Sequence, residues 1–532
     1  MPTDYGDTET LFDSVLRLRN LSRTAGPGHD TAPLQKELAT KEVALGRLDA
    51  AIEHQREVLR QMEADRETLH WCIEACRSLV APIRRLPDEI LAEILVHVPR
   101  LPNPLLSVTQ PHLLRLAAVC SRWRSIVYAT PALWQRLTID LPYTREFWNK
   151  LQGKYLPAIS RTLRLSGQCT LSVEYRQNLD GPVFVHPEIV HLLEKSAPRW
   201  RHLHLSLNVR PAKLAKSLLC QGQLSSLRTA SIFLFYPGPA ESLSMDLFGP
   251  SPALQHLELC WQGGIHIEPF PWNGLKSLRI RPGDSAAAAD MLTLLSAVPN
   301  TTRDLHVTMD FYLCENALQH HRTSHVRSLD VRITRHSLLR SVLTGLTLPN
   351  LHSLRLTAEV SSIPLDTDAF LSFCQRSSLG DTLTSLDITS VPISSDDALR
   401  CLEVLHALES LAVADHPVHD EDDLFPDANM RLVDNALLRQ LVDPLVPRLR
   451  RLEMTSAHLS FNPRLLFDLV VSRGWVFELG IGIPAGEIRR WGARQRQLAE
   501  IKRTLRPLVE EGVLRWLPER TFTVPNMWKM LE

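Results

Sequence analysis

The stretch LPNLHSLRL at residues 348–356 carries the pattern that decides the fold of this chain of 532 residues. Its leucines follow the spacing L-x-x-L-x-L, and the apolar–polar alternation at its end is typical of a half-buried strand. From about Leu137 onward the pattern recurs at Trp200–Leu203–Leu205, Leu254–Leu257–Leu259, Leu275–Leu278–Ile280, Val326–Leu329–Val331, Leu351–Leu354–Leu356, Leu383–Leu386–Ile388, Leu408–Leu411–Val413 and Leu449–Leu452–Met454, with weaker copies at Leu224–Leu227 and Leu305–Val307. Helix-like segments separate the copies.

The spacing of these copies, from about 21 to 41 residues, indicates a leucine-rich-repeat-like array with uneven loops. A strand and its return segment cannot bury their apolar faces alone, so stacked units share one core. We predict an irregular α/β solenoid over residues 141–484, with a parallel sheet on its concave face. An ordinary α/β domain with leucine-rich strands is the alternative.

Residues 485–532 predict a charged amphipathic helix that ends near Arg506–Pro507 and is followed by a short helical turn or strand. We interpret this segment as a C-terminal cap for the open end of the array. A basic surface for an acidic partner is the alternative.

Residues 34–82 predict one long helix, since no proline lies between Pro33 and Pro82 and the single glycine is Gly46. Its apolar residues recur at spacings of three and four, as in a heptad seam: Leu34, Leu38, Leu45, Leu48, Ile52, Leu59, Met62, Leu69, Ile73, Cys76 and Val80, interrupted by Lys41, Gln55 and Arg66. Such a helix spans about 70 Å. A coiled-coil homodimer through residues 34–80 and packing on the same chain both remain open. Residues 1–33 predict a disordered linker.

Residues 84–140 predict three short helices, at Pro87–Val96, His112–Val119 and Ser121–Tyr128, followed by the turn ATPALW. The segment resembles an F-box in the order and type of its residues. Leu86–Leu91 matches the opening LP-x-E-h-h, where h is apolar, and Ile94 and Leu95 continue its apolar face. Leu116, Val119, Cys120 and Trp123 match L-x-x-V-C-x-x-W, and Pro131, Leu133 and Trp134 match P-x-L-W. The link Arg100–His112 is longer than in that family.

The resemblance implies docking to a Skp-family adaptor and, through it, to a cullin–RING ubiquitin ligase. The residues it assigns to this contact are Leu86, Pro87, Ile90, Leu91, Ile94, Leu95, Leu116, Val119, Cys120, Trp123, Leu133 and Trp134. The first helix carries more apolar surface than a small domain can bury, which is typical of an interaction site. We expect that helix to make the contact, and Leu116, Val119 and Trp123 to serve mainly as core.

The composition argues against several classes of function. Lys plus Arg and Asp plus Glu both total 59, so the chain lacks the basic excess typical of nucleic-acid binders. Nine irregularly spaced cysteines fit a reducing compartment better than a disulfide framework. We see no signal peptide and no apolar run of membrane-spanning length. We therefore expect a cytoplasmic or nuclear protein without a nucleic-acid or membrane partner.

The sequence shows no catalytic constellation. P-loop, G-x-S-x-G and C-x-x-C patterns are absent. Cys72 and Cys76 lie at or beside the heptad seam, where packing is a simpler role than metal binding. For Cys314, His320, His321 and His325 we favour ordinary hydrogen bonds over metal. The run His416–Asp423 predicts an exposed acidic loop, with binding of a basic substrate as a minor alternative. We predict no enzyme activity, cofactor or metal.

Two functional hypotheses follow. The first is a substrate-recognition adaptor of a Skp–cullin–F-box ubiquitin ligase, whose repeat region binds a protein substrate. The layout also resembles fungal proteins that join a coiled-coil stretch, an F-box and degenerate leucine-rich repeats. The second is a non-catalytic scaffold dimerised through residues 34–80, independent of any ligase. Candidate substrate contacts are the variable positions of each unit, such as His202, His204, His256, Glu258 and Arg355.

Overall fold

The protein is described by a computed structural model that divides into two compact units, residues 1–91 and 92–532. The structure describes residues 13, 15–17, 19–20, 23, 32–98, 111–141, 145–177, 187–208, 224–235, 243–245, 251–261, 265–267, 270–283, 285–302, 304–311, 321–333, 336–358, 364–415, 432–443, 445–456, 459, 461–482 and 491–517. Each unit is considered by itself.

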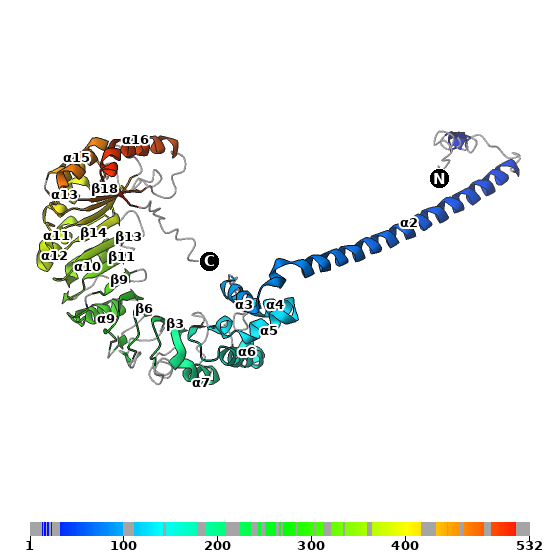
Figure 1. The fold of residues 1–532 in the computed structure, drawn as a ribbon, viewed down its shortest axis with the longest axis horizontal. Helices are drawn as coiled ribbons and strands as arrows, with labels where there is room; N and C mark the ends of the chain where they lie inside the picture. Colours follow the sequence, from blue (N-terminus) through cyan, green and yellow to red (C-terminus); the bar gives the residue numbers. More distant parts are fainter. Residues whose placement is uncertain are drawn as a thin grey trace. The chain divides into compact units, whose positions relative to one another are not determined.

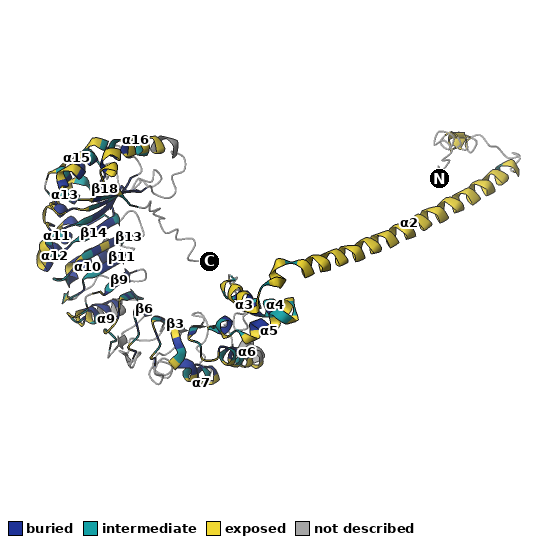
Figure 2. Ribbon diagram, viewed as in Figure 1, coloured by how far each residue is buried: buried dark blue, intermediate teal, exposed yellow. Residues whose placement is uncertain are grey.

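The first unit is dominated by helix α2, Ala32–Val80, which confirms the predicted long helix (Figure 1). Pro33 occupies its first turn, where a missing backbone N–H costs nothing. The helix ends two residues before Pro82, which begins the short 3-10 helix η1, Pro82–Arg85. None of the 49 residues of α2 is buried, as the continuous exposed colouring in Figure 2 shows.

Three short helices follow, and all begin and end within one residue of the predicted positions. They are α3, Asp88–His97, within which the two units divide, then α4, Pro111–Val119, and α5, Ser121–Ala129. The predicted turn ATPALW contains the 3-10 helix η3, Pro131–Trp134. Helices α4 and α5 pack against each other.

Within the described residues, the second unit is built on one parallel sheet of fourteen strands. In sheet order these are β1, Arg136–Leu141; β2, Leu171–Gln177; β3, Trp200–Asn208; β4, Thr229–Phe235; β6, His256–Trp261; β8, Ser277–Pro282; β9, His306–Phe311; β11, Ser328–Ile333; β13, Ser353–Ala358; β14, Ser385–Ser390; β15, Ser410–Ala414; β16, Arg451–Thr455; β17, Phe477–Gly482; and β18, Leu514–Trp516. Two small parallel pairs join β5, Leu243–Met245, to β7, Ile265–Ile267, and β10, Arg322–Thr323, to β12, Leu346–Thr347. The sheet agrees with the predicted solenoid-like α/β fold.

The strand pairing explains the recurring leucine pattern. The central apolar residue of each unit pairs with its counterpart on the next strand, which forms one ladder across the sheet. Its members, all buried, are Leu137, Val173, Leu203, Ala230, Leu257, Leu278, Val307, Leu329, Leu354, Leu386, Leu411, Leu452 and Leu479. A continuous core therefore runs the length of the array.

Helices cover one face of this sheet, while the strands line the concave face (Figure 1). The helices are α6, Arg145–Leu165; α7, Pro187–Ser196, followed by η4, Ala197–Arg199; α9, Ser285–Ser296; α10, His336–Gly345; α11, Thr367–Ser377; α12, Leu379–Thr382; α13, Ser395–Glu403; α14, Asn435–Val442; α15, Pro463–Arg473; and α16, Trp491–Glu510. Asp366, Ser394, Asp434 and Asn462 cap the N-termini of α11, α13, α14 and α15 with side-chain oxygens. No helix among the described residues has both the length and the apolar character of a membrane span.

The array is longer than the predicted range 141–484. It starts with β1 inside the segment assigned to the three helices and ends with β18 inside the segment assigned to the cap. The predicted end of the last helix near Arg506–Pro507 was also wrong, because α16 continues to Glu510. Pro507 removes one backbone hydrogen bond. Leu505 and Leu508 on either side of it are buried, and their packing holds the helix together through the proline.

Candidate functional site

Helix α3 carries two adjacent apolar rows with opposite exposure. Leu91 and Leu95 are buried, whereas Ile90 and Ile94 are 50% and 42% exposed. Pro87, just before the helix, is exposed as well. Residues four apart lie one above the other on a helix, so Ile90 and Ile94 form a continuous apolar surface in water.

The predicted contact set on this helix therefore separates into two groups. Pro87, Ile90 and Ile94 present their side chains to solvent, and Leu86 is half-buried. Leu91 and Leu95 were predicted as contacts but are buried, because their row faces the protein interior. We call Pro87, Ile90 and Ile94 the exposed α3 row.

The spacing C-x-x-W is explained by the start of α5. Cys120 is the N-cap residue of that helix, and its Sγ accepts a hydrogen bond from the backbone N–H of Trp123 at 3.5 Å. A side-chain acceptor three residues before the N–H that it binds is the geometry of a helix cap. Arg124 Nε donates to the carbonyl of Ala117 at 3.1 Å and ties α5 to α4. Cys120 and its neighbours thus hold the helix pair in shape.

The closing P-x-L-W has a similar structural role. Leu133 and Trp134 are buried, and Trp134 Nε1 donates to the carbonyl of Val127 at 2.8 Å. The Trp134 ring stacks on Tyr128 with 5.8 Å between ring centroids. The indole therefore satisfies a carbonyl in the last turn of α5, which lacks a partner within the helix. Both predicted residues lie in the core of the segment.

The expectation that Val119 serves as core was wrong, because this residue is 60% exposed at the end of α4. The pattern of apolar residues did not reveal on which side of the short helix Val119 lies. Leu116 and Trp123, expected to be core residues, are half-buried. Most of the unusual link Arg100–His112 lies outside the described residues.

A second candidate site lies on the concave face of the sheet, across β6, β8, β9, β11, β13 and β14. Side chains alternate between the two faces of a strand, so the residues beside each buried ladder leucine point to the open face. Here they are charged or polar, and they lie in neighbouring registers. We call them the polar sheet face: Glu258, Arg279, Arg281, His306, Asp310, Ser328, Asp330, Arg332, Arg355 and Asp387.

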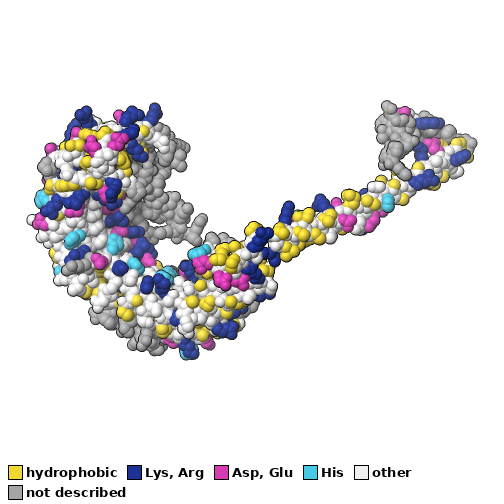
Figure 3. Space-filling view, viewed as in Figure 1, with side chains coloured by type: hydrophobic (Ala, Val, Ile, Leu, Met, Phe, Trp, Pro, Cys, Tyr) yellow, Lys and Arg dark blue, Asp and Glu magenta, His cyan; other side chains and the backbone are white. Residues whose placement is uncertain are grey.

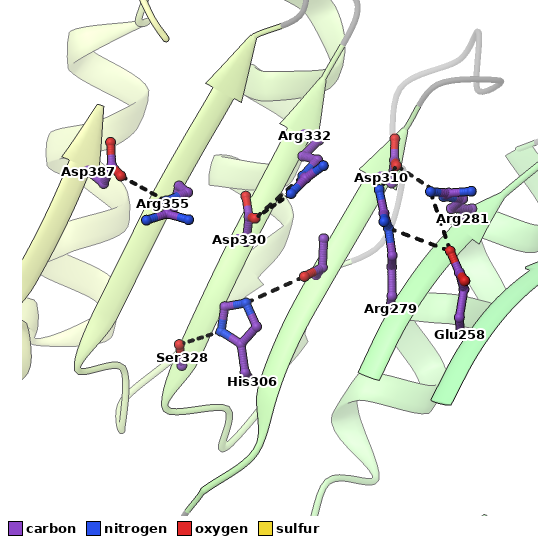
Figure 4. Close-up of polar contacts among 11 residues, drawn as sticks. Glu258, Arg279, Arg281, His306, Asp310, Ser328, Asp330, Arg332, Arg355 and Asp387 are labelled. Carbon is purple, nitrogen blue, oxygen red and sulfur yellow. Dashed lines mark hydrogen bonds and ion pairs between the residues drawn. The ribbon is translucent and has the colours of Figure 1, made fainter. Parts of the chain in front are cut away.

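The charges on the polar sheet face pair with one another (Figure 4). Asp310 Oδ2 accepts hydrogen bonds from Arg279 Nη2 at 3.0 Å and Arg281 Nε at 3.1 Å. Arg281 Nη2 also lies 3.3 Å from Glu258 Oε1. Further along the sheet, Arg332 pairs with Asp330 at 3.3 Å and Arg355 with Asp387 at 2.8 Å. Four arginines and four carboxylates therefore neutralise one another.

The carboxylates of this face are less exposed than the arginines. Asp310 and Asp330 are buried, while the arginines paired with them are partly exposed. Asp330 binds Arg332 through Oδ2 alone, and among the described residues its buried Oδ1 has no hydrogen-bond partner. This oxygen is closed to solvent, so it is an unsatisfied acceptor inside the fold and not a contact point for a bound molecule.

His306 lies beside this pair of charges. Its Nδ1 is 2.7 Å from Ser328 Oγ (Figure 4). Burial lowers the pKa of His306, the Asp330 carboxylate raises it, and the guanidinium groups of Arg355 and Arg332 lower it again. Burial also lowers the pKa of His204, which lies on strand β3 and points to the same face of the sheet. Both rings therefore favour the neutral form.

The residues named from sequence as substrate contacts all lie on strands of this sheet, in the rows that point to its open face. The same reasoning missed Arg279, Asp330 and Asp387, although each holds the position between two apolar residues of its unit. It also missed Asp310 and Arg281. The missing information was strand register, because uneven loops hide which residues become neighbours.

The cysteines and histidines considered from the sequence as possible metal ligands have ordinary surroundings where the structure describes them. Cys72 and Cys76, expected to pack at the seam, are both exposed on α2 in the single chain. His321 hydrogen-bonds Thr347 at 3.0 Å, and Asn350 Nδ2 lies 3.3 Å from His325 Nδ1. Cys314 and His320 lie outside the described residues. No group of three metal-binding side chains occurs among the residues that the structure describes.

The acidic run His416–Asp423 also lies outside the described residues, but the residue before it has a clear role. Buried Asp415 accepts hydrogen bonds from the backbone N–H groups of Leu432 and Val433 at 2.9 and 2.8 Å, and from Ser456 Oγ at 2.5 Å. One carboxylate therefore joins the end of β15 to the chain that precedes α14.

Comparison with protein families adds information on one segment of the chain. No curated protein matches the chain. Residues 83–140, from the start of η1 through most of β1, match the F-box-like family, and the chain therefore carries an F-box-like domain there.

Proposed function

We propose that this protein is a substrate-recognition adaptor of a Skp–cullin–F-box ubiquitin ligase, working in the cytoplasm or nucleus. The exposed α3 row binds the Skp-family adaptor, and the polar sheet face binds a protein substrate. The chain itself performs no catalytic step, since the ligase partners supply the chemistry.

The exposed α3 row is the observation that carries this proposal. Two isoleucines one turn apart stay in water, whereas Leu91, Leu133 and Trp134 of the same segment are buried. Leaving that surface in water costs about 25 cal/mol per Å², which a partner would recover. The match of residues 83–140 to the F-box-like family supports a Skp-family adaptor as this partner.

The polar sheet face supports substrate binding of a particular kind. Its charges cancel within the face, so a substrate gains little from net charge alone. Recognition would instead depend on hydrogen bonds to the partly exposed groups of this face, such as Arg332, Arg355 and Ser328. We expect the substrate segment to present both donors and acceptors, as an extended polypeptide does.

Binding of the full chain to a purified Skp-family adaptor tests the docking. Ile90→Asp and Ile94→Asp should abolish capture, because each places a charge in a buried apolar contact. The matched control is Val471→Asp on α15, since Val471 is 54% exposed and lies outside the F-box-like domain. Capture that survives both isoleucine changes in a folded protein would refute the proposal.

Two further variants separate docking from folding. Leu91→Asp places a charge at a buried position and should lower the free energy of unfolding as well as binding. Pro87→Ala should weaken capture with little effect on stability, because Pro87 is exposed. The circular dichroism melting curve of each variant distinguishes loss of the contact from loss of the fold.

The substrate-binding half of the proposal needs its own test. Affinity purification with the full chain, in cells whose proteasome is blocked, should recover a protein that the variant Arg355→Glu/Asp330→Asn fails to recover. A control change at the exposed helix α13, Arg400→Glu, should recover it normally. Equal recovery by all three chains would refute the assignment of the polar sheet face.

A further inference from the structure

Helix α2 keeps one heptad spacing along its length, and its residues are exposed apart from half-buried Leu34. Fourteen positions from Leu34 to Val80 follow alternating spacings of four and three, and eleven of them are apolar. We call these fourteen positions the α2 seam. Leu45 and Met62 in it are each about 60% exposed. Figure 3 shows hydrophobic side chains along the length of α2.

A strict seven-residue repeat of this length specifies the kind of partner. A straight α-helix drifts about 20° per heptad away from such a seam, so the seam stays covered only when two helices of the same repeat supercoil. The next longest described helices, α6 and α16, have 21 and 20 residues and contain Pro157 and Pro507. Neither matches the heptad register from Leu34 to Val80, whereas a second copy of α2 matches it over its whole length.

We propose that α2 pairs with α2 of a second copy of this chain as an antiparallel coiled coil, with Glu57 of both copies at the two-fold axis. In this arrangement, each seam residue meets the seam residue that lies equally far on the other side of Glu57. All fourteen positions are then paired. The inference does not depend on docking to a ligase.

The three polar seam residues decide the orientation. In a parallel, in-register pair, Lys41 would face Lys41 and Arg66 would face Arg66, which places like charges in the seam. In the antiparallel pair, Lys41 meets Ile73, Gln55 meets Leu59 and Arg66 meets Leu48 of the second copy. Long lysine and arginine stems cover an apolar neighbour while their charges reach water.

The residues that flank the seam favour the same orientation. Helical side chains lean toward the N-terminus, so in an antiparallel pair those on the same side of the seam converge. The converging pairs are Glu42 with Arg77, Asp49 with His70 and Arg56 with Glu63. Each pair joins opposite charges when His70 is protonated. The two-fold axis makes each pair occur twice in the dimer. The parallel pair instead brings Glu37 close to Glu42 of the second copy.

The antiparallel pair has a consequence for the whole protein. The F-box-like domain follows the C-terminus of α2, and that end of each helix lies at the opposite end of the pair. At 1.5 Å per residue the two α2 C-termini lie about 70 Å apart. A dimer would therefore present two separate F-box-like domains, each free to bind its own partner.

A natural cysteine tests the orientation in the full chain. Cys76 is a seam residue, so mild oxidation of a parallel dimer would join Cys76 to Cys76 of the second copy. In the antiparallel dimer Cys76 meets Leu38, and we expect Leu38→Cys to form a disulfide with it. Leu38→Cys/Cys76→Ser should not form that disulfide. Mass spectrometry of the crosslinked peptides identifies the pair, and a Cys76–Cys76 link would overturn the antiparallel arrangement.

Two neighbouring residues test whether the pair forms at all. Leu45 and Val43 are 59% and 57% exposed in the single chain, but only Leu45 lies in the α2 seam. Sedimentation of the full chain at micromolar concentration should show a dimer, which Leu45→Asp dissociates and Val43→Asp leaves intact. A monomeric wild-type chain, or equal effects of both changes, would overturn the proposal.

Discussion

Helix α2 and the fourteen-stranded sheet use the same apolar residue in opposite ways. Leu45 and Leu48 recur along α2 with a period that places them on one side, and both are exposed. Leu278 and Leu354 recur along the array with a longer period, and both are buried. Each array leucine finds the next one within its own chain, one strand away.

A repeat of apolar residues therefore predicts burial only when the surface that covers each copy is known. The array repeats its unit along the chain, so every unit supplies the surface that the previous one needs. The α2 heptad repeats within a single helix, so its neighbour must come from a different helix.

Leu278→Ala should lower the free energy of unfolding of the array by about 3 kcal/mol, because it opens a cavity in the ladder between β6 and β9. Leu45→Ala removes the same atoms from α2 and should leave that transition unchanged. Urea denaturation followed by tryptophan fluorescence measures both, since Trp200 and Trp261 are buried in the array. Equal losses would mean that Leu45 is buried against the array.

Asp310→Ala should lower the free energy of unfolding by about 2 kcal/mol, because it leaves Arg279 and Arg281 without their shared carboxylate. The value lies below that of a fully buried pair because both arginines keep part of their surface in water. Asp368→Ala removes an equally short pair with Arg400, 3.1 Å apart, but this pair is exposed. We expect no measurable change from it, and the reverse order of effects would contradict the burial of the polar sheet face.

The array should also lose stability as the pH falls below about 6.5, the ordinary pKa of histidine. Burial lowers the pKa of His306 and of His204, so the unfolded chain takes up protons before the folded chain does. Unfolding then becomes easier with acid. Urea denaturation at pH 7.5 and 5.5 measures the change, and His306→Gln should reduce the pH dependence. An unchanged pH dependence in that variant would show that His306 does not contribute.

Much of the fold followed from the sequence because the signals were local. The heptad seam between Pro33 and Pro82 predicted α2, and the L-x-x-L-x-L copies predicted the strands of the array. The strands β1, β2, β17 and β18 lay outside the clear copies: β1 is RLTIDL and β17 is FELGIG. Their apolar residues are buried by neighbouring strands, which the local pattern does not record.

The candidate sites were less predictable for the same reason. The sequence identified the apolar residues of α3 but not which row, Ile90 and Ile94 or Leu91 and Leu95, would face solvent. Both rows satisfy the same pattern, and only packing separates them. Likewise Arg279 and Asp310 are 31 residues apart, and their contact depends on strand register between β8 and β9.

The smallest effect concerns the orientation of the proposed α2 pair. Glu42 has no charged residue three or four positions away on its own helix, so a change there acts mainly between chains. Glu42→Lys replaces an attraction to Arg77 of the second copy by a repulsion, twice in each antiparallel dimer. Exposed pairs contribute about 0.5 kcal/mol each, so we expect the dissociation constant of the dimer to rise about fivefold. The same change would tighten a parallel dimer, because it removes the repulsion between Glu37 and Glu42. The sign of the shift in the dissociation constant, measured by sedimentation equilibrium beside the outward-facing control Ala39→Lys, therefore distinguishes the two orientations even if the magnitude is small.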